Sequence, residues 1–157
     1  MRIRYFAYPV EPGDIDDARR NPFCHLGVDP YAGRDPTEPG SEVLYLDRYW
    51  RYLQALLAPA PAHPSRPSYA LVAGDVVRIG DRWVPHVEVL TPAQVNDAAW
   101  DLDSVSLREI DAFLEAFPTE NEVKADGLSC VPRCLRDARR FTVDLAGDGR
   151  GLIYLIG

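Results

Sequence analysis

The sequence predicts an α+β fold in which about four helices pack on a mixed β-sheet within a single domain, residues 1–157. Three observations lead to this prediction. Thr91 and Ser106 each begin a capping-box pattern that is typical of helix starts. Residues 44–59 form an amphipathic stretch. The chain closes on an unbroken apolar run, Leu152 to Ile156, which is typical of a strand covered on both faces, so we expect this strand at the centre of the sheet.

The other strands are expected in the N-terminal and middle parts of the chain. Ile3, Tyr5 and Ala7 alternate with Arg2, Arg4 and Phe6, which predicts a first strand. Further strands are predicted at 43–46, 70–72, 76–79 and 83–89. Pro85 has no amide hydrogen, so the last of them is expected to be an edge strand or a bent one. Residues 21–40 and 59–67 are rich in proline and predict irregular loops.

The amphipathic stretch LYLDRYWRYLQALLAP predicts a helix that begins after Asp47. Leu46, Trp50, Leu53 and Leu57 recur at helical spacing and should face the core. The Asp47 carboxylate is placed to accept a backbone N–H of the first turn as an N-cap. Proline residues at 59 and 61 should end the helix.

Three further helices are expected. The first should run from Thr91 to about Leu102, with Val95, Ala98, Ala99 and Leu102 facing inward. The second should follow Ser106 and stop before Pro118, presenting Ile110, Phe113, Leu114 and Phe117. The third should begin near Pro132 and reach Phe141, with a tight glycine connection at 147–151 before the final strand.

The same stretches resemble the YfbM-like family of small bacterial proteins of unknown function, also called DUF1877. The resemblance rests on the 44–59 stretch, on ALVAGDVVRIGDRWVPHVEVLTPAQV and on the closing PRCLRDARRFTVDLAGDGRGLIYLIG, which together cover most of the chain. Two departures stand out: Arg51 and Gln54 occupy positions where relatives often carry histidine, and residues 82–85 replace a glycine-flanked motif. The resemblance implies a fold but no chemistry.

The composition indicates a folded, acidic protein. The chain has 157 residues, 46% of them hydrophobic, which is enough to bury a continuous core. A formal net charge of −7 argues against nucleic-acid and anionic-membrane surfaces, because these require clustered positive charge. The N-terminus lacks the apolar core of a signal peptide, and three cysteines fit a reducing compartment, so we expect a cytoplasmic protein.

The cysteines raise the question of a metal site. Cys130 and Cys134 have the spacing of one helix face, and Cys24 with His25 could complete a tetrahedral zinc site. The Cys-x-x-x-Cys spacing is looser than that of structural zinc knuckles and contains Pro132. We therefore interpret the cysteines as buried thiols and expect no metal and no cofactor. The sequence also lacks the nucleotide-binding, nucleophile-elbow and zinc-protease motifs.

The candidate binding residues are Asp47, Trp50, Arg51, Trp83 and His86. If a pocket exists, we expect it between the helix that follows Asp47 and the segment from Trp83 to His86. The two tryptophans would form its walls, and Asp47, Arg51 and His86 would supply polar contacts. The competing interpretation makes Asp47 a helix cap, Trp50 a core residue and His86 the polar end of an edge strand.

Two acidic groups could also suggest paired carboxylates or a cation site: Asp14 with Asp16 and Asp17, and Asp101 with Asp103. The first group is explained by the preference of acidic side chains for the first turn of a helix. Asp101 and Asp103 are harder to explain in this way, because they fall near the end of a predicted helix.

Taken together, these features favour a binding or protein-interaction domain, of an immunity-like or regulatory kind, whose partner is a basic protein or a small molecule. The alternative is a small-molecule hydrolase or transferase that uses His86 and nearby carboxylates.

Overall fold

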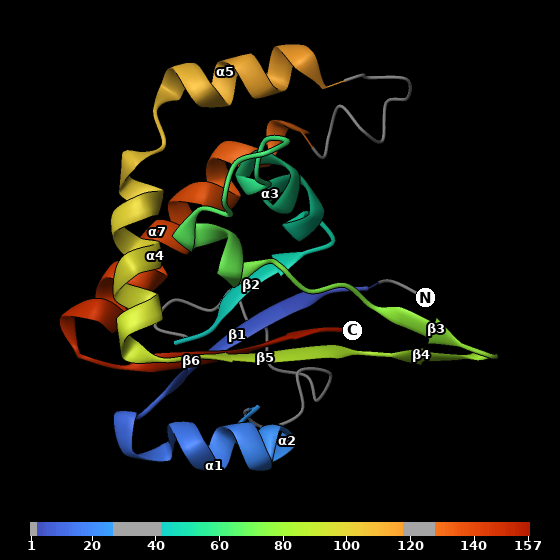
Figure 1. Cartoon of the computed structure of the whole chain (residues 1–157), viewed down its shortest axis with the longest axis vertical. Helices are drawn as coiled ribbons and strands as arrows, with labels where there is room; N and C mark the ends of the chain where they lie inside the picture. The colour runs from blue at the N-terminus through green and yellow to red at the C-terminus, as the bar shows by residue number, and fades with distance from the viewer. Residues whose placement is uncertain (1–2, 27–41, 118–127) are drawn as a thin grey trace.

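The computed structural model describes residues 3–26, 42–117 and 128–157, and its centre is a four-stranded antiparallel sheet (Figure 1). The strand order is β2-β1-β6-β5, and each neighbouring pair is antiparallel. A separate two-stranded sheet is formed by β3 and β4. The strands are β1 (Tyr5–Val10), β2 (Leu44–Asp47), β3 (Val77–Ile79), β4 (Arg82–Val84), β5 (His86–Leu90) and β6 (Gly151–Ile156).

The C-terminal strand β6 lies in the interior of the sheet, as predicted, with β1 on one side and β5 on the other. All six of its residues are buried. The α+β class is confirmed, but the described pairs are antiparallel where a mixed sheet was expected. The apolar run required cover on both faces of the sheet, and helices on both faces provide this cover without any parallel pairing.

The helices divide between the two faces. They are α1 (Ile15–Arg20), α2 (Pro22–His25), α3 (Trp50–Leu57), α4 (Pro92–Ser104), α5 (Leu107–Ala116) and α7 (Val131–Gly147), with 3-10 turns η1 (Pro12–Asp14) and η2 (Pro67–Leu71). In Figure 1, α3, α4 and α7 lie above the sheet and α1 and α2 lie below it. Among the described residues, no helix is both long and apolar enough to cross a membrane.

Two apolar clusters hold these layers together. On the upper face, Tyr5, Leu152 and Tyr154 of the sheet pack in one cluster with Trp50 and Leu102 of the helices. On the lower face, a second cluster joins alternate residues of the same strands to α1; it consists of Phe6, Tyr8, Val10, Ile15, Ala18, Leu26, Val89, Ile153 and Leu155. Alternation along β1 and β6 therefore sends side chains into both clusters.

Both predicted capping boxes are present. The Thr91 and Ser106 side chains each accept a hydrogen bond from the backbone of the residue three positions later, and Gln94 and Glu109 return the contact. The predicted inward residues of α4 are all buried: Val95, Ala98, Ala99 and Leu102. In α5 the predicted apolar face is mostly half-buried, with Ile110 alone fully buried among the described residues of that helix.

Three element predictions were wrong. Residues 70–72 do not form a strand; they are the last two residues of η2 and the residue that follows it. This turn is held by long-range contacts such as the Tyr5 hydroxyl donating to the Leu71 carbonyl at 2.9 Å. The last helix, α7, continues past Phe141 to Gly147, because Thr142 and Leu145 are buried against the core. The predicted strand at 83–89 is divided at Pro85 into β4 and β5, and β5 is an edge strand as expected. Most of the predicted loop at 21–40 lies outside the described residues.

Candidate functional site

The residues predicted to form a pocket lie at opposite edges of the main sheet. One row of paired residues runs from Asp47 on β2 through Tyr5 and Ile156 to His86 on β5. Neighbouring strands are about 4.8 Å apart, so Asp47 and His86 are separated by roughly 14 Å across this row. They are not neighbours in one cluster.

Asp47 is not the N-cap of α3. Helix α3 begins at Trp50 after Tyr49, which makes no side-chain cap, and Asp47 ends β2 with a φ of 49°. Its carboxylate lies 3.6 Å from the Arg4 guanidinium. The prediction failed because the strand extends to Asp47 and a turn separates it from the helix. Aspartate tolerates this left-handed conformation better than most residues.

Trp50 lies in the core and is 1% exposed. The guanidinium of Arg51 lies 5.2 Å from the centre of the Trp50 ring and 3.4 Å from the Asp75 carboxylate. The indole ring is therefore covered by protein rather than by solvent, and Arg51 is held at the surface by an exposed ion pair.

Residues 72–75 lie between α3 and His86. The Gln54 side-chain amide donates to the carbonyl oxygens of Val72 and Gly74, at 2.6 and 3.0 Å. Gly74 presses against the His86 ring so closely that a Cβ built there would lie 1.9 Å from it. Residues 72–75 thus occupy the space where the sequence predicted a pocket.

His86 is half-buried beside two other polar groups. Its Nε2 lies 3.8 Å from the Glu88 carboxylate, and its ring lies 5.7 Å from the ring of Tyr154. Burial raises the pKa of Tyr154 above its usual range, and the negative charge of Glu88 adds to this effect. The raised pKa extends the range of pH over which the Tyr154 hydroxyl stays neutral, and its ring lies beside the imidazole.

Trp83 lies on the β3–β4 hairpin, which extends away from the main sheet on the right of Figure 1. Its ring is 42% exposed and stacks near Arg78, whose guanidinium lies 5.8 Å from the ring centre. Trp83 and Trp50 therefore do not face each other across a common cavity: one is in the core and the other is on a projecting hairpin.

The cysteines are not gathered together. Cys24 is exposed, Cys130 is half-buried, and burial raises the pKa of the Cys134 thiol to about 11. Across residues 3–26, 42–117 and 128–157, no three His, Cys, Asp or Glu side chains are grouped so that they could hold a metal ion.

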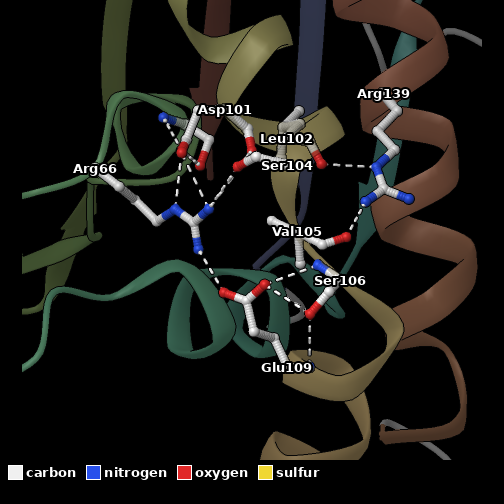
Figure 2. A network of polar contacts seen from close by, with 9 residues as sticks. Arg66, Asp101, Leu102, Ser104, Val105, Ser106, Glu109 and Arg139 are labelled. Atoms are coloured by element: carbon white, nitrogen blue, oxygen red, sulfur yellow. Dashed lines mark hydrogen bonds and ion pairs between the residues drawn. The ribbon is translucent and has the colours of Figure 1, made fainter.

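The most extensive polar network of the described structure lies at the corner between η2, α4 and α5 (Figure 2). Arg66 donates two hydrogen bonds to the Asp101 carboxylate, from Nε at 2.9 Å and from Nη2 at 3.0 Å. The backbone amide of Ser68 donates to the same carboxylate at 3.0 Å, and its buried hydroxyl also contacts it. Burial raises the pKa of Asp101, but these hydrogen bonds lower it more, so the pKa lies below its usual range.

The same corner fixes the end of α4 to its neighbours. Arg139 of α7 donates to the carbonyls of Leu102 and Val105, at 2.8 and 2.5 Å, and so joins the C-terminal end of α4 to α7. Arg66 also lies 3.7 Å from Glu109, the capping-box residue of α5 (Figure 2). The network thus joins four elements and accounts for Asp101, one of the two acids that the sequence left unexplained.

Beside this corner, the outer face of α4 exposes a tryptophan between two acids. Trp100 is 73% exposed. Asp97 and Asp103 stand three residues before and after it, so all three side chains share one side of the helix. Both acids are exposed, and neither makes an ion pair or hydrogen bond within the part of the chain that the structure describes. We refer to Asp97, Trp100 and Asp103 as the α4 face.

Sequence reasoning missed the α4 face, although one signal for it was present. Helical spacing places Trp100 opposite the inward residues Val95, Ala98 and Leu102, and a large aromatic residue on the polar side of an amphipathic helix is a candidate contact residue. From the sequence, Asp103 was interpreted only as a member of a carboxylate pair or as a possible cation ligand.

The class of protein that these features define is an α+β domain whose antiparallel sheet carries helices on both faces. No protein-family model and no curated protein sequence matches the chain. Its structure is similar to the crystal structure of YfbM from Escherichia coli, a protein of unknown function, with a TM-score of 0.60, 14% sequence identity and 99% of each chain covered. The YfbM-like resemblance is therefore confirmed for the fold, and a likeness at this identity concerns the fold alone.

Proposed function

We propose that this protein is a protein-interaction module that binds a basic segment of a partner protein through the α4 face. The observation that carries the proposal is Trp100, which is 73% exposed on one side of a helix between two carboxylates that make no ion pair with any described residue. An indole ring attracts an arginine or lysine side chain through its π face, and each neighbouring carboxylate can add an ion pair. The net charge of −7 supports the same kind of partner.

Stability does not account for the position of Asp103. It lies in the last turn of α4, where the aligned backbone carbonyls already carry partial negative charge. A carboxylate at this position is unfavourable by about 0.3–1 kcal/mol when exposed. A residue that costs stability at the surface is a reasonable candidate for a binding role.

The polar corner supports the proposal by giving the α4 face a fixed framework. Asp101, the residue next to Trp100, accepts hydrogen bonds from Arg66 and Ser68, and Arg139 donates to the carbonyl of Leu102. A surface built on a rigid element loses less conformational entropy on binding than a mobile one.

The composition also supports proposals about the extent of the domain, its location and its class of partner. We propose a single domain over residues 1–157, located in the cytoplasm, with an immunity-like or regulatory role and with no nucleic acid as partner. Three cysteines without a disulfide among the described residues are compatible with a reducing compartment.

The experiment that tests the proposal measures binding of a fluorescent hexa-arginine peptide by anisotropy. Trp100→Ala and the double variant Asp97→Asn/Asp103→Asn should each weaken binding about tenfold, which corresponds to about 1.4 kcal/mol. The matched control is Asp111→Asn/Glu115→Gln, which removes the same amount of charge from an exposed pair on α5 that has no tryptophan between its members. Equal losses in the control and the α4-face variants would show that general acidity attracts the peptide, and the proposal would fail.

A second candidate is the small-molecule hydrolase or transferase, which one observation favours: the His86 imidazole lies 3.8 Å from Glu88 and close to the neutral Tyr154. An imidazole beside a carboxylate can act as a general base. Hydrolysis of p-nitrophenyl acetate and p-nitrophenyl phosphate by the wild type and by His86→Ala would test this candidate. Equal rates for the two proteins would reject it for ester and phosphoester substrates.

A further inference from the structure

A second unpartnered surface lies on the β3–β4 hairpin. Directly paired residues of a hairpin project to the same side, and the pairs here are Val77 with Val84 and Ile79 with Arg82. One face of the hairpin therefore carries three aliphatic side chains and a guanidinium. The aliphatic residues are 57%, 43% and 65% exposed for Val77, Val84 and Ile79. We call these four residues the hairpin face.

The charge of the hairpin is opposite to that of the α4 face. Arg82 makes no ion pair within the described residues, whereas Arg78, on the other side of the hairpin, lies 3.7 Å from Asp81 and close to Trp83. The hairpin face thus combines apolar side chains with one unpaired positive charge. The α4 face combines an apolar ring with two negative charges that have no ion-pair partner in the described part of the chain.

An isolated two-stranded hairpin is at best marginally stable in water, so an uncovered aliphatic face on it indicates a contact with another molecule. In Figure 1 the hairpin and α4 lie at opposite ends of the view, the hairpin at the right and α4 at the left. The two surfaces therefore cannot meet within one molecule.

We infer that the hairpin face of one molecule docks on the α4 face of a second copy of this chain. Arg82 would lie between Asp97 and Asp103 of the other copy, and Val77, Ile79 and Val84 would cover the Trp100 ring. The inference rests on the proposed function, since it names the hairpin of a second copy as a basic segment that the α4 face binds. Because the two surfaces differ, the contact is head-to-tail (heterologous), and repeating it produces a linear oligomer.

The net charge of −7 on each copy opposes association, and the strength of this repulsion depends on the salt concentration. At about 0.15 M salt, charges more than about 8 Å apart are largely screened, whereas the contact between Arg82 and the carboxylates is not. The hairpin face is small compared with the roughly 800 Å² per partner of a standard interface. We therefore expect weak, concentration-dependent association rather than a permanent dimer.

Sedimentation velocity over a wide range of protein concentrations tests the inference with charge reversals. The wild type should sediment faster as its concentration rises. Arg82→Glu and Asp103→Arg should each weaken association at least about tenfold when measured alone. An equimolar mixture of the two variants should associate again, because the intact hairpin of the second variant can dock on the intact α4 face of the first. Arg19→Glu, a reversal on α1, should leave the wild-type behaviour unchanged.

Circular dichroism checks that each variant is folded, and Arg82→Gln with Asp103→Asn replace the reversals if one is not. A wild type that stays monomeric at every concentration, or association that neither reversal weakens, would overturn the inference. Binding of the hexa-arginine peptide distinguishes a failure of the self-association inference from a failure of the proposed function. A monomeric protein that still binds the peptide through the α4 face would refute self-association alone, whereas a protein that does neither would refute both.

Discussion

Asp101 illustrates how a single acid can serve structure while its neighbours remain free for binding. Its side chain is 15% exposed and receives hydrogen bonds from Arg66 and Ser68. Asp103, two residues later, is exposed and makes no such contact. Two acids that look alike in the sequence therefore have different roles, because one points toward η2 and the other toward solvent.

Replacing Asp101 by Asn should lower the free energy of unfolding by about 2 kcal/mol at neutral pH, because Arg66 and Ser68 lose a charged acceptor. The pKa of Asp101 is depressed in the folded state, so its contribution is present above the unfolded pKa of about 3.9 and is lost as the pH falls through the folded value. Urea unfolding at several pH values should therefore show the difference between wild type and variant shrinking in acid.

The matched control for this prediction is Asp103→Asn. It removes a carboxylate from the last turn of the same helix, where the charge is unfavourable, so stability should stay the same or rise slightly. Equal destabilisation by both variants would contradict the separate roles assigned to the two acids.

Gly74 offers a second prediction for a single residue. An added Cβ would lie 1.9 Å from the His86 ring, so Gly74→Ala should force the ring from its place beside Tyr154 and lower the unfolding free energy by about 1–3 kcal/mol. When the His86 ring is already removed, the same glycine substitution should cost much less: the double variant Gly74→Ala/His86→Ala should be nearly as stable as His86→Ala alone. Thermal or urea unfolding of all four proteins measures the coupling, and simple additivity would contradict the contact.

At the scale of elements, local signals predicted helix starts better than helix ends. The capping boxes at Thr91 and Ser106 depend on residues three positions apart, so the sequence alone could reveal them. The position of η2 depends on Ser68 meeting Asp101, which is 33 residues away in the sequence, and no local pattern predicts that contact. The error at Asp47 has a similar cause, because strand pairing with Tyr5 overrides its preference for a cap.

The end of α7 has a local cause in the glycine-rich sequence that follows it. Gly149 adopts a φ of 68°, and the amides of Gly149 and Arg150 bond back to the carbonyls of Ala146 and Leu145, at 3.2 and 2.9 Å. These paired contacts form a Schellman motif, which needs a left-handed residue at this position. The predicted tight connection is therefore a helix cap.

Gly149→Ala should lower the unfolding free energy by about 1 kcal/mol, because alanine is strained at positive φ. Gly147 is the control: it ends the helix at ordinary φ and has open space around it, so Gly147→Ala should be neutral or stabilising by up to about 1 kcal/mol. Chemical denaturation measures both variants. A larger loss at Gly147 than at Gly149 would contradict this account of the cap.

At the scale of the whole molecule, the sequence predicted the buried C-terminal strand and the helices α3, α4, α5 and α7, but neither α1 and α2, which cover the lower face of the sheet, nor the surfaces. The burial of β6 and the inward faces of α3 and α4 follow from apolar periodicity. Apolar periodicity does not predict which polar groups meet across the fold. The predicted site residues Asp47 and His86 therefore proved to be on opposite edges of the sheet. The α4 face and the hairpin face became visible only once their neighbours were known.

Binding at the α4 face can be observed directly by titrating the 15N-labelled protein with the hexa-arginine peptide and following the three tryptophan indole N–H signals. Trp50 is buried, Trp83 lies beside Arg78, and Trp100 stands between the exposed carboxylates of Asp97 and Asp103. We expect the Trp100 signal to shift in a saturable way and the other two signals to stay in place. The double variant Asp97→Asn/Asp103→Asn should abolish the shift. A Trp100 signal that does not move while the peptide binds elsewhere would contradict the assignment of the α4 face as the binding surface.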